Sequence, residues 1–162
     1  MNEWHEFEER VHDELELLSD EISAVAPLTR KLQQHEPDPI ELRAAATTLH
    51  AFYNGVERIL VQIMRRFDDS IPNSTRWHRE LLDQAIESTS DRSAIVGSEL
   101  HDSLVDYLGF RHVFRHNYPA TLRWRQCKSL FHRLEQVHEE FRLEIEQFLD
   151  SHKPTENTSE EE

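Results

Sequence analysis

Apolar residues recur at spacings of three and four along most of the chain, which is the period of a helix with one buried face. The stripes cover residues 7–25, 42–67, 77–86, 100–118 and 127–148. Segments rich in turn-favouring residues separate them, and no stretch shows the alternating pattern of a half-buried strand. The pattern therefore predicts an all-α fold, an up-and-down bundle of about five helices.

Prolines and one capping sequence mark the predicted helix boundaries. Pro27 is expected to end or kink the first helix. Asp38 can cap the second helix, a proline follows at the first helical position, and Glu41 completes a capping box. The fourth helix is expected to run from about residue 94 until Pro119 ends or breaks it.

Length and composition narrow the class of protein. The 162 residues fit one domain, with a helical domain over residues 1–150 and an acidic tail over 151–162 that we expect to be disordered. Cys127 is the single cysteine, so it cannot form an intramolecular disulfide and fits a reducing cytoplasm. The N-terminus is charged and no apolar run approaches the length of a membrane span. A cytoplasmic protein without a membrane partner is predicted.

The charge is unevenly distributed along the chain. The formal net charge is −14, yet residues 107–134 contain six Arg or Lys, three His and no Asp or Glu. A local basic surface on an acidic body can receive a phosphate backbone. The residues that we single out for positioning RNA in this way are Arg115, Arg123, Arg125 and Lys128. For each of them, a solvated helix face is the alternative.

One arginine falls on an apolar stripe. Arg111 follows Leu104 and Tyr107 at helical spacing, and a buried arginine needs a carboxylate partner, a pocket open to solvent or a groove between subunits. His116 and Tyr118 lie close by in sequence. An arginine with fixed donors, a histidine that titrates near neutrality and a tyrosine hydroxyl suit a phosphodiester site. Because the helix is expected to loosen before Pro119, ideal helical angles do not place His116.

These residues carry a family resemblance. The stretch from Arg111 to Tyr118 matches the R-x4-H-x-Y motif of the HEPN superfamily. More narrowly, residues 49–60, 77–82 and 110–118 resemble, in the same order, segments of the HepT-like ribonuclease toxins of prokaryotic toxin–antitoxin pairs. The resemblance extends from about residue 40 to residue 150.

The resemblance implies a dimeric HEPN-like bundle in which the motifs of two subunits face a shared cleft. It implies a metal-independent endoribonuclease that needs no cofactor, with tRNA as the family-level expectation for its substrate. Arg111 would bind the scissile phosphate, and His116 would be the acid or base. Tyr118 would accept AMP from a partner nucleotidyltransferase antitoxin of the MNT type, which silences the toxin.

Two departures and three alternatives accompany this resemblance. Pro119 and Ala120 follow the motif tyrosine where close relatives have Gly and an aromatic residue, and His112 stands where many HEPN proteins have Asn. His112 and His116 are one helical turn apart, but no further metal ligands are evident, so no metal site is predicted. The competing function classes are the toxin, a catalytically silent HEPN module that binds nucleotides or a protein, and a dimeric interaction protein.

Overall fold

The computed structural model describes residues 2–155, and within that range the chain is all-helical with no strand. The elements are α1 (Glu3–Ala24), α2 (Ala26–Lys31), α3 (Pro39–Phe67), α4 (Trp77–Ala85), α5 (Ser98–His116), the 3₁₀ turn η1 (Pro119–Thr121) and α6 (Trp124–His152). The predicted all-α class is confirmed. Six α-helices stand where about five were expected, because the chain bends before Pro27 and starts the short α2.

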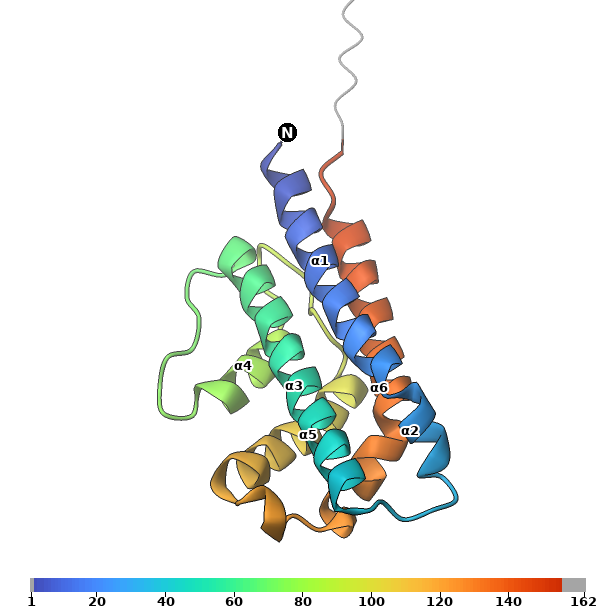
Figure 1. The fold of residues 1–162 in the computed structure, drawn as a ribbon. Coiled ribbons are helices and arrows are strands. Elements are labelled where there is room, and N and C mark those ends of the chain that lie inside the picture. Colours follow the sequence, from blue (N-terminus) through green and yellow to red (C-terminus); the bar gives the residue numbers. More distant parts are fainter. Residues whose placement is uncertain (1, 156–162) are drawn as a thin grey trace, which may run out of the picture.

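Three long helices form the body of the molecule. Figure 1 shows α1, α3 and α6 running alongside one another, with α5 crossing them at the end where α3 begins and α4 lying against the side of α3. The core between them contains the stripes predicted from the sequence. On α3 the fully buried side chains include Leu49, Phe52, Val56, Leu60 and Ile63.

The predicted start of α3 is confirmed in atomic detail. The Glu41 amide donates to Asp38 Oδ1 at 2.8 Å, and the Asp38 amide donates to Glu41 Oε1 at 3.1 Å. This capping box satisfies two backbone donors that the helix itself leaves free. Lys31 at the end of α2 then pairs with Glu41 at 2.8 Å, so the cap also holds the α2–α3 connection.

A buried ion pair attaches α4 and the loop after it to the end of α3. Arg92 donates to both carboxylate oxygens of Asp68, at 2.6 and 2.9 Å, and the Gln84 amide donates to the same carboxylate at 2.7 Å. Burial opposes ionisation of Asp68, but the hydrogen bonds from Arg92 and Gln84 outweigh it and lower the pKa of that carboxyl. The pair fixes one wall of the pocket described below.

Two predicted boundaries differ from the structure. The helix α5 begins at Ser98 and not near residue 94, because the Ile95 and Val96 amides donate to the Ala85 carbonyl at the end of α4. The last helix continues through His152, whose ring stacks on Phe148 at 4.0 Å, so residue 150 lies within its final turn. The rest of the predicted tail, residues 156–162, lies outside the described residues. No helix in residues 2–155 is both long and apolar enough to cross a membrane.

Candidate functional site

The side chain of Arg111 borders a pocket between α3, α4 and α5. The pocket has a volume of about 420 Å³, which falls within the roughly 300–1,000 Å³ range of small-molecule sites. Its lining combines arginines, amides and an indole: Glu14, Asn54, Glu57, Arg58, Val61, Gln62, Arg65, Trp77, His78 and Arg111. Most of these residues come from α3, so one helix supplies a continuous wall.

Arg111 has no carboxylate partner among residues 2–155. Its Nε is buried and has no hydrogen-bond partner there, and the guanidinium forms no ion pair within 4 Å in the same range. Of the three environments expected for this arginine, the chain therefore provides the pocket open to solvent. Unpartnered buried donors are rare in folded proteins, and each calls for an explanation such as a missing ligand.

Two of the lining residues, Glu57 and His78, form a close pair. His78 Nδ1 lies 2.7 Å from Glu57 Oε2, and the His78 ring stacks on Trp77 with centroids 3.6 Å apart. This histidine is the partner of the buried Glu57 carboxylate. Tyr53 lies beside the pair, where burial and the Glu57 carboxylate raise the pKa of its hydroxyl. Glu57 is thus engaged and leaves the Arg111 guanidinium free.

A second histidine lies next to Arg111 on the α3 side. The His50 ring stacks on Phe114 of α5 with centroids 4.5 Å apart, and its Nε2 is buried without a partner in the described chain. Burial lowers the pKa of His50, and the positive charges of Arg111 and Arg115 lower it further. His50 is therefore held neutral at pH 7.

His116 is the last residue of α5 and is exposed. The helix was expected to loosen before Pro119, and it does so at Asn117, where the chain becomes extended. Because α5 stays helical through His116, ideal helical angles do place this residue, contrary to expectation. Five residues along an α-helix correspond to a rotation about 140° past a full turn and a rise of about 7.5 Å. In a single chain, Arg111 and His116 therefore point in different directions. The ring of His116 instead lies 4.2 Å from that of His112, centroid to centroid.

Tyr118 lies outside the helix, with φ −68° and ψ 143°. It does not share a helical face with Arg111, as a straight helix would have placed it. Its side chain is 82% exposed, so in the single chain it does not pack against the helix end. Its hydroxyl is open to a second protein.

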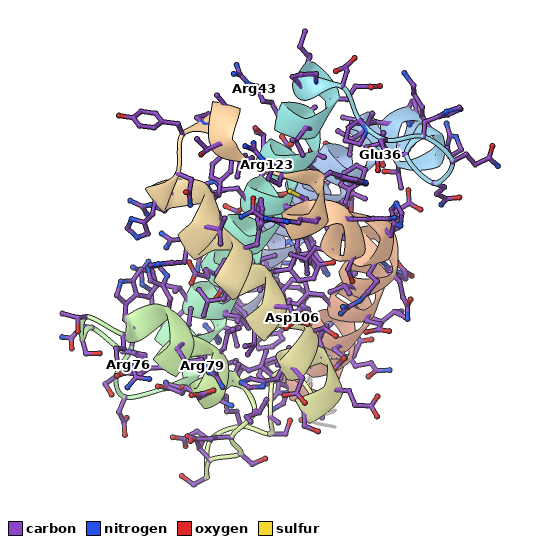
Figure 2. The ribbon with its side chains drawn as sticks, turned by 90° about the horizontal axis from the view of Figure 1, so that it is seen from below. Glu36, Arg43, Arg76, Arg79, Asp106 and Arg123 are labelled. Carbon is purple, nitrogen blue, oxygen red and sulfur yellow. The ribbon has the colours of Figure 1, made fainter. Side chains whose placement is uncertain are left out.

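The predicted RNA-positioning residues all lie on the surface at the turn from α5 to α6. Arg115, Arg123, Arg125 and Lys128 are exposed. The Arg123 side chain donates to the Leu122 carbonyl at 3.1 Å beside the start of α6. Figure 2 shows Arg123 and Arg43 at one end of the molecule and Arg76 and Arg79 of α4 at the other. Arg115 lies one helical turn after Arg111 on α5, so this turn adjoins the Arg111 side of the helix.

Sequence reasoning missed most of the pocket. Arg58, Gln62 and Arg65 follow Asn54 at spacings of four, four and three, which places all four on one face of α3. That spacing is a usable signal, but it does not show that α4 brings Trp77 beside this face. Trp124 packs edge-on against Phe131 with centroids 6.1 Å apart.

No metal-binding cluster accompanies the two neighbouring histidines. Within residues 2–155, no group of three or more His, Cys, Asp or Glu side chains is arranged to hold a metal ion.

Comparison with known proteins identifies one family. A family model described as HepT-like protein matches residues 44–152, about two thirds of the chain. No curated protein and no solved structure matches the chain. The matched range contains α5, α6 and all of the pocket except Glu14.

Proposed function

Because the chain belongs to the HepT-like protein family, we propose that it is a metal-independent endoribonuclease toxin of a HEPN/MNT toxin–antitoxin pair. Its substrate is RNA, with tRNA as the first candidate. Its control is AMP attachment to Tyr118 by an MNT-type nucleotidyltransferase antitoxin. The observation that carries the proposal is Arg111, a partly buried guanidinium without a partner in residues 2–155 that borders a solvent-open pocket.

Arg111 supplies charge stabilisation in this proposal. A guanidinium presents several N–H donors in a fixed plane and binds two phosphoryl oxygens at once. During cleavage those oxygens gain negative charge, and donors already in place stabilise them without reorganisation. Within residues 2–155, the Nε has no hydrogen-bond partner and no carboxylate lies within 4 Å of the guanidinium, so the group is available for this task.

His116 supplies proton transfer. As a base it takes the proton of the ribose 2′-hydroxyl, whose oxygen attacks the neighbouring phosphorus. The bond to the 5′-oxygen breaks, and that oxygen takes up a proton. The products are a 2′,3′-cyclic phosphate and a 5′-hydroxyl end. The exposed position of His116 at the end of α5 gives it access to an RNA chain.

Tyr118 fits the role of the regulatory acceptor. Its side chain is 82% exposed on an extended segment, so a modifying enzyme can reach the hydroxyl without unfolding a helix. A phosphodiester attached there adds a negative charge next to Arg115 and His116 and opposes the approach of an RNA backbone. Pro119 is the first residue of η1, and the side chain of the preceding Tyr118 points into solvent.

The test is cleavage of total RNA by purified protein in EDTA. Wild-type protein should cut RNA and leave 2′,3′-cyclic phosphate ends. Arg111→Ala and His116→Ala should each lower the rate roughly a hundredfold or more, as the loss of a positioned proton-transfer or charge-stabilising group does. His35→Ala is the matched control, because His35 is an exposed histidine in the loop before α3.

Other outcomes would point elsewhere. Cleavage abolished by EDTA, or 5′-phosphate products, would contradict the 2′-hydroxyl mechanism. RNA that is bound and released intact by the wild type would favour the catalytically silent HEPN module. For the switch, intact mass after co-expression with the antitoxin enzyme should show added AMP on wild-type protein and none on Tyr118→Phe.

A further inference from the structure

We propose that the pocket between α3, α4 and α5 binds one nucleotide of the RNA, next to the phosphate held by Arg111. In this proposal, the base of the bound nucleotide stacks on Trp77, and the edge of that base forms hydrogen bonds with the side-chain amide of Gln62. This inference rests on the proposed function and goes further, since it assigns base recognition to residues of α3 and α4 that lie outside the R-x4-H-x-Y motif.

The proposed phosphate contacts come from arginines at the pocket that have no partner in the described chain. Arg58, Arg65 and Arg111 border the pocket, and none of them forms an ion pair or a side-chain hydrogen bond within residues 2–155. Two carboxylates border it as well, and Glu57 is already held by His78 at 2.7 Å. The three guanidinium groups therefore outweigh the acids, and a phosphate-bearing ligand is favoured over a neutral one.

The apolar wall of the pocket provides the proposed contact with the base. Trp77 is partly buried and Val61 lies near it on the pocket surface. An indole face binds a nucleobase by stacking, and all four bases can use such a contact. The His78 ring holds Trp77 in place from one side, since the two rings are 3.6 Å apart and tilted by 29°. A rigid aromatic platform next to arginines is suited to a nucleotide.

Amide groups supply the means to select a base. Gln62 borders the pocket and its Oε1 is buried with no partner in the described chain. Asn54, eight residues and about two turns earlier on α3, borders the same pocket. A buried carbonyl oxygen without a donor is costly unless a ligand satisfies it. Base edges carry both donors and acceptors, and amides pair with them in a base-dependent way. Gln62 is thus a specificity residue in this proposal.

Binding measured in a His116→Ala background tests the pocket without cleavage of the RNA. The probe is a fluorescently labelled short single-stranded RNA followed by anisotropy at two salt concentrations. Trp77→Leu should weaken binding about tenfold, as removal of a stacked aromatic does. Arg65→Gln should weaken binding and lower the salt slope by about one, as the loss of a phosphate contact does. Arg43→Gln should leave the RNA affinity and the salt slope unchanged.

Arg43 is a matched control because it lies on the same helix, is exposed and has the same charge. It stands 22 residues before Arg65, about 33 Å along the helix axis, and Figure 2 shows it at the end opposite α4. Gln62→Leu guards against a variant that merely fails to fold, since it replaces an unsatisfied amide with an apolar group of similar size. It should stay folded by circular dichroism and lose preference among the four homopolymeric RNAs.

The outcomes separate the pocket from the toxin activity. The proposed nucleotide pocket is overturned if all three variants, Trp77→Leu, Gln62→Leu and Arg65→Gln, bind RNA as tightly as their parent and with the same base preference. This holds even if wild-type protein cleaves RNA. If they bind weakly while wild-type protein cleaves nothing, the pocket stands and the ribonuclease proposal fails. Trp77-dependent binding of nucleoside monophosphates with no binding of RNA would overturn the assignment to an RNA nucleotide. No binding of RNA by the parent would overturn it as well.

Discussion

At the scale of single residues, the Nε of Arg111 is buried and has no hydrogen-bond partner in residues 2–155. Under the proposed function, this group lowers the free energy of unfolding of the chain because it is kept for binding RNA. A buried donor without a partner costs free energy that an apolar side chain of similar length would not. We therefore expect Arg111→Met to keep or raise the free energy of unfolding, by up to about 1 kcal/mol, while it removes RNA binding. Urea denaturation and the anisotropy assay measure the two effects.

A carboxylate-paired, purely structural arginine would behave in the opposite way. Its removal would strand a buried acid and lower stability by several kcal/mol. Arg92 is such an arginine in this chain, with its side chain fully buried against Asp68. A large loss of stability in Arg111→Met, comparable to that of Arg92→Met, would contradict the functional assignment.

A second expectation at this scale concerns His50 and pH. Burial and the nearby arginines lower its pKa below the ordinary value of 6.5, so the folded chain binds fewer protons at this site than the unfolded chain. Stability from this group is complete above pH 6.5 and decreases as the pH falls through that value. Burial lowers the pKa of His138 as well, in the same direction.

The measurement is an NMR titration combined with urea denaturation. The His50 resonance, assigned by its loss in His50→Gln, should titrate with a midpoint below 6.5. The same variant should show a smaller loss of stability than wild type between pH 7.5 and pH 5.5. A midpoint above 6.5 would contradict the burial of this ring and the effect of the two nearby arginines on it.

Arg111 and Tyr118 illustrate how much of the candidate site the sequence predicts. The place of Arg111 on an apolar stripe predicted its partial burial, because helical periodicity is local information. Its environment depended on α3 and α4, whose approach is set by long-range packing that no spacing reveals. Tyr118 shows the converse, since Pro119 was a local signal for the chain break and an exposed side chain followed from it.

At the scale of elements, the periodicity predicted α1, α3 and α6 well, and their core residues are buried as expected. Long amphipathic helices with a proline or capping box at their ends carry this information locally. The start of α5 was misplaced because Ile95 and Val96 are buried without being helical. Their amides bond to the Ala85 carbonyl, a contact across two elements.

The ion pair between Asp68 and Arg92 gives a prediction for the pocket wall. Asp68→Ala should lower the free energy of unfolding by about 3 kcal/mol or more, since it leaves a buried guanidinium without its partner. Asp69→Ala, an exposed neighbour, should change it by less than about 0.5 kcal/mol. Urea denaturation at neutral pH measures both.

The same pair should matter for RNA binding. Because Asp68 also accepts from Gln84 of α4, its loss should let α4 and therefore Trp77 move relative to α3. We expect weaker RNA binding by Asp68→Ala under conditions where it remains folded. Equal stability of the Asp68 and Asp69 variants would show that the ion pair is not what holds α4 in place.

At the scale of the whole molecule, one chain leaves the proposed catalytic groups apart. Arg111 borders the pocket on one side of α5, and His116 projects from the last turn of the same straight helix, about 140° away. A second copy related by a two-fold axis along the exposed end of α5 would bring the histidine of one subunit to the arginine of the other. Under the proposed function, the site would need that copy to be complete.

We therefore predict a homodimer at micromolar concentration with α5 in its interface, measured by light scattering.

The decisive measurement is complementation between two inactive variants. If each site combines Arg111 of one subunit with His116 of the other, a mixed dimer of Arg111→Ala and His116→Ala contains one intact site and one doubly damaged site. Random mixing should then restore about a quarter of wild-type cleavage. If each site lies within one chain, both sites of the mixed dimer carry a substitution and the mixture stays inactive. A monomer in solution would remove the basis for a shared site altogether.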